Sequence, residues 1–275
     1  MQYQPLPFIQ VAAERLEEGQ WFVFIVRLGE EEGNLQMNDK LVLCIPGQWK
    51  DEDKLIRKLT RKSSGEYSLT GGLLLDTKRN RAFEIRIEEQ DPKLAEAFYL
   101  SSKGDFSDKT MQKVEKHTMV IYLSGYMGSA EAVQRMIAPV QMLLACGGVA
   151  VKIENCDKAF TPEEWNMIGE EARLDQLLNT MISYMQDEHY FYSCGMQMFG
   201  LPDVALSKET DPDASLQVMS QFLYLMMNAS EGTKDKLNEF KLYGTTYQYH
   251  HQEGFFQEES SSINNPYGIY VLTQI

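Results

Sequence analysis

Hydrophobic and polar positions follow one clear pattern between residues 117 and 155. An apolar run at 120–123 has the β-branched and aromatic composition of a buried strand. The Gly-containing turn SGYMGS at 124–129 and an Ala-, Met- and Leu-rich helical stretch follow it. Gly147-Gly148 ends the helix, and 149–154 returns as a strand. Two strands joined through a helix are most simply parallel neighbours with a right-handed crossover. The pattern therefore predicts a strand–helix–strand unit in the middle of the sheet.

Two residues set expected boundaries inside this unit. Ser129 has the side chain of an N-cap and directly precedes the helical stretch. Pro139 lies within that stretch and cannot donate a hydrogen bond to the carbonyl of Arg135, so we expect a kink or a break there.

The rest of the chain shows the same two periodicities. The segment Thr161-Pro162-Glu163-Glu164 is the most specific helix start, because it combines an N-cap, a first-turn Pro and a capping-box Glu. From there one helix, or two in tandem, extends to residue 186. Predicted strands cover 21–28, 41–45, 69–76, 81–88, 190–194, 243–251 and 269–272, and further helices cover 12–19, 51–62, 91–98 and 214–228.

Interleaved helices, strands and hairpins predict an α+β (mixed α/β) fold with helices packed on a mixed β-sheet. Strand–turn–helix–strand order occurs near 41–88 and again near 118–154, so two similar halves remain an option. We divide the chain into an N-terminal α+β half, 1–110, and a C-terminal half, 111–275. One continuous domain is the alternative, and residues 1–40 either join the main domain or form a separate arm.

Composition narrows the class of protein. Among 275 residues, 43% are hydrophobic and 24% charged, which is ordinary for a globular domain. The 40 acidic and 26 basic residues give a net charge of -14, which argues against a nucleic-acid-binding surface. The first residues lack the pattern of a signal peptide, and the longest weakly polar stretch, 132–151, contains Arg135 and Pro139. We therefore expect a protein of the cytoplasm that binds neither nucleic acid nor membrane.

The cysteines and histidines show no metal-binding pattern. No CxxC motif and no HExxH motif is present, so we expect no metal and no cofactor. His250 and His251 are adjacent on a predicted strand and therefore point to opposite faces. Widely spaced cysteines in a long chain are typical of buried thiols in a reducing compartment. The four are Cys44, Cys146, Cys156 and Cys194.

The turn at 124–129 is a candidate anion site. It places Ser124, Gly125, Gly128 and Ser129 at a helix N-terminus, where free N–H groups and the helix dipole favour negative charge. No Lys follows the second Gly, and the spacing is not GxGxxG. A tight strand-to-helix connection explains the same residues, and we favour that interpretation.

A second candidate is Cys194, at the end of an aromatic strand beside Gly195. A nucleophilic cysteine needs a base and an orienting group, and His117, His189 and Asp203 are of suitable types. A buried structural thiol is the commoner explanation for such a residue.

A charged pair is the third candidate. Lys152 and Glu154 alternate on the predicted strand 149–154, so both lie on one face and can point into a cleft at the strand end. An ordinary solvated strand end is the simpler interpretation.

Several motifs in order resemble a known family. They are LVLCIPGQW, GGLLLD followed by DPKLAEAF, HTMVIYLSGYMGSAEAV, GGVAVKIEN, YFYSCGMQMFGLPDV and NPYGIYVL. Over about residues 41–275 the chain resembles an uncharacterised bacterial family, a domain of unknown function. The resemblance implies a cytosolic bacterial protein and assigns no activity. After Cys194-Gly195-Met196, where the family pattern leads us to expect a His, this chain has Gln197.

Two hypotheses about function follow. The first is a non-enzymatic module that recognises a protein partner, as a regulator, an inhibitor or an immunity-type factor. The acidic composition, the many aromatic and Met residues and the incomplete catalytic sets favour it. The second is a small-ligand-binding protein or hydrolase-type enzyme that uses the turn 124–129 together with Glu154, Cys194 and Asp203.

Overall fold

The computed structural model describes residues 9–15, 21–27, 40–208, 211–229, 239–242, 244–253 and 265–275. Helices and strands interleave along these segments, so the predicted α+β class is confirmed. Among the described residues, no helix combines the length and the apolar character that crossing a membrane requires.

The first of the two larger sheets has seven strands, and every neighbouring pair in it is antiparallel. In spatial order the strands are β4 (Tyr67–Thr70), β5 (Leu73–Asp76), β6 (Arg81–Glu89), β7 (Met119–Tyr126), β3 (Lys40–Gly47), β8 (Val151–Ile153) and β9 (Lys158–Phe160).

The second sheet has six strands and is mixed, because β12 and β15 are parallel while its other pairs are antiparallel. In spatial order the strands are β10 (Ser183–Gln186), β11 (Tyr190–Cys194), β12 (Asp203–Ser207), β15 (Ile269–Gln274), β14 (Thr245–Gln252) and β13 (Glu239–Leu242).

A separate hairpin precedes both sheets. It pairs β1 (Ile9–Arg15) with β2 (Trp21–Arg27) in antiparallel register. The helix expected over 12–19 is therefore wrong at its start, since residues 12–15 lie in β1; residues 16–19 lie outside the described part. The partner strand β2 supplies backbone hydrogen bonds that a local propensity argument does not see.

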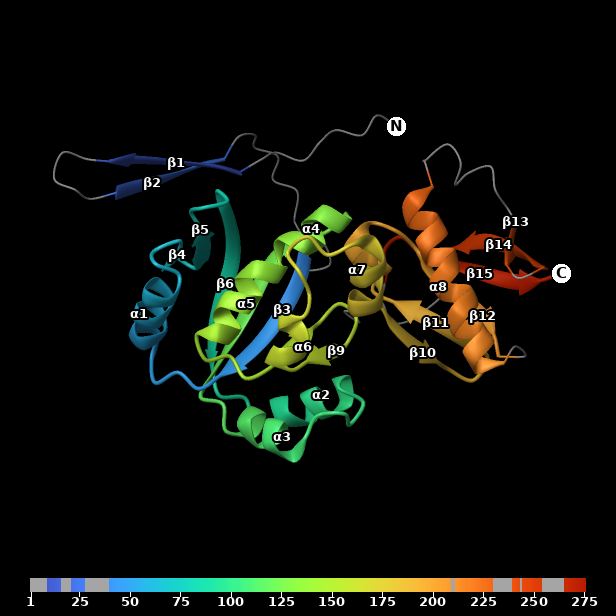
Figure 1. Cartoon of the computed structure of the whole chain (residues 1–275), viewed down its shortest axis with the longest axis horizontal. Coiled ribbons are helices and arrows are strands. Elements are labelled where there is room, and N and C mark those ends of the chain that lie inside the picture. Colours follow the sequence, from blue (N-terminus) through green and yellow to red (C-terminus); the bar gives the residue numbers. More distant parts are fainter. Residues whose placement is uncertain are drawn as a thin grey trace.

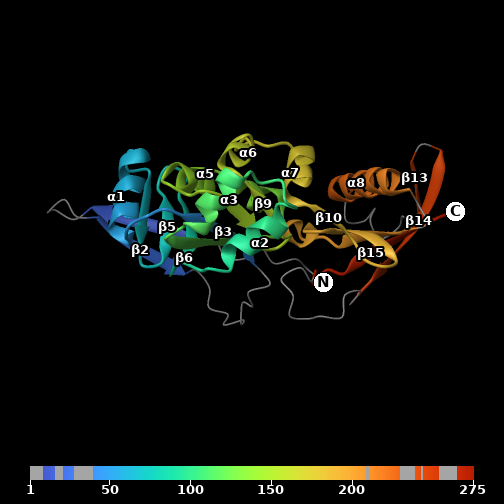
Figure 2. The same cartoon turned by 90° about the horizontal axis from the view of Figure 1, so that it is seen from below.

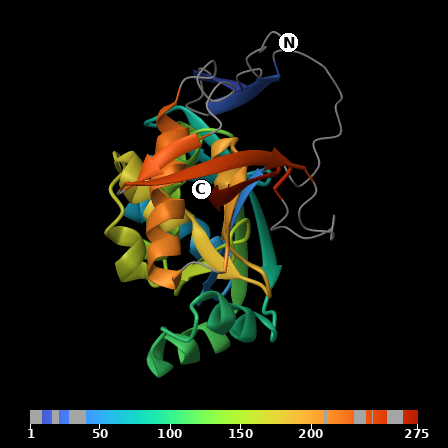
Figure 3. The ribbon, with the colours of Figure 1, turned by 90° about the vertical axis from the view of Figure 1, so that its right-hand side faces the viewer.

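Helices cover the sheets unequally. The two sheets lie side by side along the long axis, and α5, α6, α7 and α8 form a layer on one side of them (Figure 1, Figure 2). On the opposite face of the seven-stranded sheet, α2 and α3 pack against Cys44 and Val120 and project from the body (Figure 3). The helices are α1 (Glu52–Lys62), α2 (Leu94–Ser101), α3 (Asp108–Glu115), α4 (Ala130–Arg135), α5 (Ile137–Ala145), α6 (Pro162–Asn166), α7 (Leu174–Met181) and α8 (Pro212–Asn228), with the short 3-10 helix η2 (Met196–Phe199).

The predicted central unit is correct in its parts but wrong in one pairing. β7 and β8 run in the same direction and a helical segment joins them, yet β3 lies between them and pairs with both. β3 comes earlier in the chain and is apolar toward both faces, with Leu43 and Cys44 fully buried on opposite sides. Such a strand gains most from a central position, which is why it separates the two strands that sequence order makes neighbours.

The helix break falls before Pro139 rather than at it. α4 ends at Arg135 and α5 begins at Ile137, so Pro139 lies in the first turn of α5, where its missing N–H costs no helical hydrogen bond. Ser129 is the N-cap of α4, as predicted, and its hydroxyl accepts a hydrogen bond from the N–H of Ala132 at 3.1 Å.

Other predicted elements differ mainly at their ends. The strand expected over 69–76 is split into β4 and β5 by Gly71 and Gly72, which both have positive φ. The capping box at Thr161 is present, but the helix it starts is short. The stretch to residue 186 holds α6, α7 and the strand β10.

Residue 110 does not separate the two sheets. β7, β8 and β9 follow it in sequence and pair into the same seven-stranded sheet as β3 to β6, which precede it. The change from one sheet to the other comes later, between β9 and β10.

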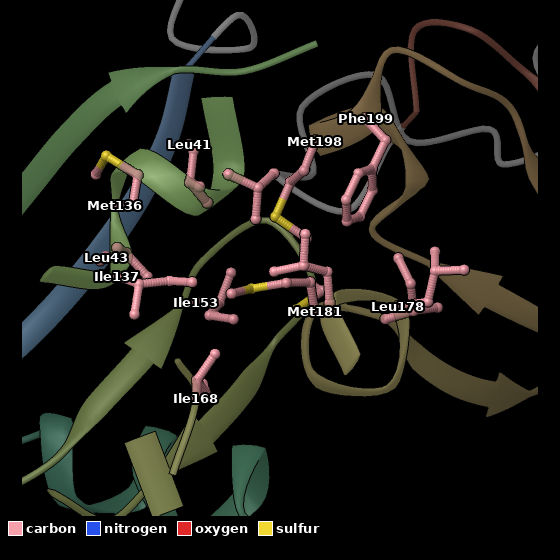
Figure 4. Close-up of a cluster of buried hydrophobic side chains, with 14 of the residues drawn as sticks. Leu41, Leu43, Met136, Ile137, Ile153, Ile168, Leu178, Met181, Met198 and Phe199 are labelled. Carbon is pink, nitrogen blue, oxygen red and sulfur yellow. The ribbon is translucent and has the colours of Figure 1, made fainter. Parts of the chain in front are cut away.

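An apolar cluster joins the two sheets at this change. Buried side chains of β3 and β8 from the first sheet meet those of α7 and η2, which flank the second (Figure 4). The labelled members are Leu41, Leu43, Met136, Ile137, Ile153, Ile168, Leu178, Met181, Met198 and Phe199. We call this region, with the polar groups described below, the seam.

Two glycines bring the chain segments of the seam into backbone contact. The N–H of Gly128 donates to the carbonyl of Met198 at 2.8 Å. Gly200, with φ +74°, lies so close that an added Cβ would be 2.8 Å from the carbonyl oxygen of Gly128. Only a residue without a Cβ allows this approach.

We predict that Gly200→Ala lowers the free energy of unfolding by about 3 kcal/mol, because it adds a backbone clash to the left-handed strain. Gly71→Ala is the matched control: Gly71 also has positive φ, but nothing lies within 4 Å of its added Cβ. The control should cost about 1 kcal/mol. Urea denaturation measures the free energy of unfolding of both variants. Equal decreases in the two variants would contradict the close contact between Gly200 and Gly128.

Candidate functional site

The seven candidate residues lie in three separate places. Gly125, near the end of β7, lies with Gly128 and Ser129 at the start of α4. Ser124 and Glu154 belong to one face of the seven-stranded sheet, and Cys194 and Asp203 lie in the seam.

The β7–α4 connection already uses the groups that an anion would need. Gly125 lies inside β7, where an added Cβ would be 2.4 Å from the sulfur of Met136. The N–H of Gly128 is bonded to Met198, and the hydroxyl of Ser129 caps α4. α4 has six residues, so its macrodipole is small. This geometry supports the interpretation as a tight connection.

A row of polar side chains crosses the seven-stranded sheet on the face that carries α2 and α3. The strand register places Arg86 opposite Tyr122, Tyr122 opposite Cys44, and Cys44 opposite Lys152. The guanidinium of Arg86 lies 4.7 Å from the centre of the Tyr122 ring. The sequence did not reveal this row, because its members come from four strands that are distant along the chain.

Ser124 and Glu154 lie beside this row. Ser124 pairs with Glu84 and Val42, and the N–H of Glu154 donates to the carbonyl of Val42 at 3.0 Å. Two of the predicted site residues are therefore brought onto one face, with Val42 between them.

Lys152 is the centre of an ion-pair network at the end of the row. Its Nζ lies 2.8 Å from Oε2 of Glu154 and 3.0 Å from Oδ1 of Asp157. The same Asp157 oxygen accepts a hydrogen bond from the hydroxyl of Ser101 at 2.7 Å, which ties α2 to the β8–β9 turn. The predicted Lys152–Glu154 pair is present, and a second carboxylate holds it in place.

Burial and neighbouring charges shift the ionisation of this region. Burial alone would lower the pKa of Lys152, but Glu154 and Asp157 raise it above its ordinary value. Burial raises the pKa of the Cys44 thiol well above its usual range, and the carboxylate of Glu154 adds to the effect. Lys152 is therefore charged and Cys44 neutral at neutral pH, so neither group is prepared to act as a base or a nucleophile.

Asn155 connects the two sheets. Its side-chain oxygen accepts a hydrogen bond from the N–H of Val42 at 2.9 Å, and its Nδ2 donates to the carbonyl of Lys40 at 3.0 Å. Its main-chain carbonyl accepts from Nε2 of Gln197 at 3.2 Å and from the thiol of Cys194 at 3.6 Å. One residue that is 5% exposed therefore bonds β3 on one side and β11 with η2 on the other.

Asp203 holds the other side of the seam. Its Oδ1 accepts hydrogen bonds from the hydroxyl of Ser193 at 2.7 Å and from the N–H of Met196 at 3.2 Å. Its Oδ2 accepts from Nδ2 of Asn265 at 2.7 Å. The donors are neutral, so this buried carboxylate is stabilised by hydrogen bonds and not by a cation.

The two seam residues have raised pKa values. Burial raises the pKa of Asp203 to about 6, although its hydrogen bonds from Asn265 and Ser193 act in the opposite direction. Burial also raises the pKa of Cys194 well above its ordinary value, and the charge of Asp203 adds to the shift. A thiol with a raised pKa that is 1% exposed does not supply a reactive thiolate.

The histidines expected to assist Cys194 do not form a triad with it in this structure. His117 lies between α3 and β7, where its Nδ1 is 2.6 Å from the carbonyl of Val114 and its Nε2 accepts from the N–H of Asp91. His189 lies at the β10–β11 turn, at the opposite end of β11 from Cys194. The four cysteines are all buried and unbridged, which confirms the expectation of buried thiols.

Within the described segments, no group of three His, Cys, Asp or Glu side chains is arranged to hold a metal ion. The residue that sequence reasoning missed is Asn155. An Asn directly after a strand is a common turn residue, and nothing in the local sequence shows that it bonds a second sheet.

Comparisons with known proteins add no further constraint: no family model, no curated protein and no solved structure matches the chain.

We predict that Asp203 makes the stability of the protein depend on pH between about 6 and 3.8. The folded state binds the proton more tightly than the unfolded state, so this contribution is fully present at low pH and is lost as pH rises through 6. Relative to Asp203→Asn, the wild type should gain about 2 kcal/mol in the free energy of unfolding between pH 7 and pH 4.

Denaturant unfolding of both proteins at four pH values measures this difference. Asp213→Asn, which removes an exposed carboxylate from the first turn of α8, is the control for the loss of one negative charge. A difference between the wild type and Asp203→Asn that stays constant from pH 7 to pH 4 would contradict the raised pKa.

Proposed function

We propose that the chain is a non-enzymatic module that binds a protein partner, as a regulator, an inhibitor or an immunity-type factor in a bacterial cytosol. One observation carries the proposal: Cys194 and Asp203, the candidate residues whose types are best suited to catalysis, are 1% and 2% exposed and serve as hydrogen-bonding parts of the seam. Neither side chain is open to a substrate in this structure. The motif resemblance supports the bacterial and cytosolic part of the proposal.

The outer faces of the helices support the same function. Tyr99 and Leu100 are 55% and 63% exposed on the side of α2 that faces away from the sheet. Single exposed apolar residues are normal on protein surfaces, but Tyr is enriched among the residues that contribute most to binding at protein interfaces, and here it lies beside an exposed Leu. Tyr224 is exposed in a similar way on α8.

A small-ligand-binding function is the second candidate, and one observation favours it. Ser124 and Glu154 lie on the same sheet face as Tyr122 and Lys152, and all four come from β7, β8 or the residue after it. Because Lys152 is already neutralised by two carboxylates, we rank this function below protein binding.

The proposal is tested by photo-crosslinking in host cells. A photoreactive amino acid replaces one exposed residue on each of three faces: Arg57 of α1, Tyr99 of α2 and Tyr224 of α8. We expect at least one position to give a discrete adduct with a single protein, while the buried Leu178 position, used as a control, gives none. The absence of a protein adduct at all three exposed positions would contradict a protein-binding function.

A further inference from the structure

Helix α1 carries a row of basic residues on one face. Their spacing of i, i+3, i+4, i+7 and i+8 places them on one side of the helix, while Leu55 and Leu59 on another side are fully buried. Four of the five are exposed and Lys58 is partly buried. The members of this basic stripe are Lys54, Arg57, Lys58, Arg61 and Lys62.

The stripe is not neutralised by neighbouring carboxylates. Lys40, Lys78, Arg79, Arg86, Arg135, Lys152 and Arg173 each form an ion pair. None of the stripe residues forms an ion pair within the described part of the chain. The Nζ of Lys58 lies over Gly147 at the C-terminal end of α5.

Helix electrostatics explain only part of the stripe. The macrodipole favours cations in the last turn, which accounts for Arg61 and Lys62. It does not account for Lys54 and Arg57, which lie one or two turns earlier. An ordinary solvated helix mixes both signs of charge, whereas this face has one sign in a chain whose net charge is -14.

Resting on the proposed function, we infer that the basic stripe of α1 binds an acidic segment of the protein partner. α1 lies at the outer end of the seven-stranded sheet, away from the seam, so its outer face is accessible without any rearrangement (Figure 1). Arg57 and Arg61 have the planar, forked donors that bind carboxylates in a bidentate manner.

A nucleic acid fits this surface less well. The stripe spans residues 54–62, about 12 Å of helix, while duplex DNA carries one charge per about 1.7 Å along its whole length. A duplex that extends beyond the stripe would meet the acidic remainder of the chain, including Asp51, Glu52 and Asp53 in and before the first turn of α1. A short acidic segment places its carboxylates on the stripe alone.

A membrane surface also fits poorly. Amphipathic helices that bind membranes insert an apolar face, and the apolar face of α1 is buried against the protein through Leu55 and Leu59. The stripe can therefore attract an anionic membrane surface through charge, but α1 has no free apolar face to insert into the membrane. The partner that remains is an acidic protein segment about as long as the last two turns of α1.

The binding test uses a labelled 21-residue helical peptide with Glu at i, i+3, i+4, i+7 and i+8, and its fluorescence anisotropy at 50 mM NaCl. We expect Arg57→Glu/Arg61→Glu to weaken binding at least tenfold and 250 mM NaCl to weaken it for the wild type. The control is Lys113→Glu/Lys116→Glu, the same charge change on an exposed residue of α3 and on its exposed C-cap, which should alter affinity less than twofold. Circular dichroism checks that both variants are folded.

Three outcomes overturn the inference. If the α1 variant and the α3 control lost the same amount of affinity for the peptide, net charge and not α1 would control binding. A 20-base-pair duplex that binds more tightly than the peptide, and loses affinity in the α1 variant, would indicate a nucleic-acid surface. Phosphatidylglycerol vesicles that bind more tightly than the peptide would indicate a membrane surface.

Crosslinking separates this inference from the proposed function. Adducts from position 57 should map to partner segments rich in Asp and Glu, and Arg61→Glu should abolish them. Adducts from Tyr99 or Tyr224 but none from position 57 would contradict the role of α1 and leave the protein-binding function intact. The lack of adducts at every position would contradict both.

Discussion

The structure depends on the contact between its two sheets. β9 and β10 are edge strands of different sheets, and among the described strands no backbone ladder crosses from one sheet to the other. Side chains, together with the single backbone hydrogen bond from Gly128 to Met198 described above, make the connection instead. Apolar residues of β3, β8, α7 and η2 fill the seam, and Asn155 and Asp203 satisfy the backbone groups that the seam buries (Figure 4). A buried donor or acceptor left without a partner costs about 1–3 kcal/mol, so these two polar residues are as necessary as the apolar ones.

This requirement explains why Cys194 and Asp203 are buried and hydrogen-bonded in the seam. A thiol, a carboxylate and an amide near a glycine turn resemble a catalytic nucleophile with its base and orienting group. In the seam these side chains have another role. Each forms a hydrogen bond with a buried polar group that water cannot reach. In the described part of the chain, α1 exposes basic side chains and α2 exposes Tyr99 and Leu100.

The sequence predicts local features such as helix caps correctly, but it does not predict which strands pair with one another. The cap at Ser129, the capping box at Thr161 and the strand composition of 120–123 are properties of short segments, and the structure contains all three. The position of β3 between β7 and β8 depends on how a strand from far earlier in the chain is buried, which no local pattern encodes. Asn155 was missed for the same reason, since its partners come from β3, β11 and η2.

The central claim is that the polar groups of the seam hold the two sheets together as one folding unit. Native-state hydrogen exchange, read by mass spectrometry, compares β7 of one sheet with β12 of the other in the wild type and in Asn155→Leu. The account predicts equal opening free energies for β7 and β12 in the wild type, and an earlier, separate opening of β12 in the variant. Separate opening of the two sheets in the wild type, unchanged by Asn155→Leu, would contradict it.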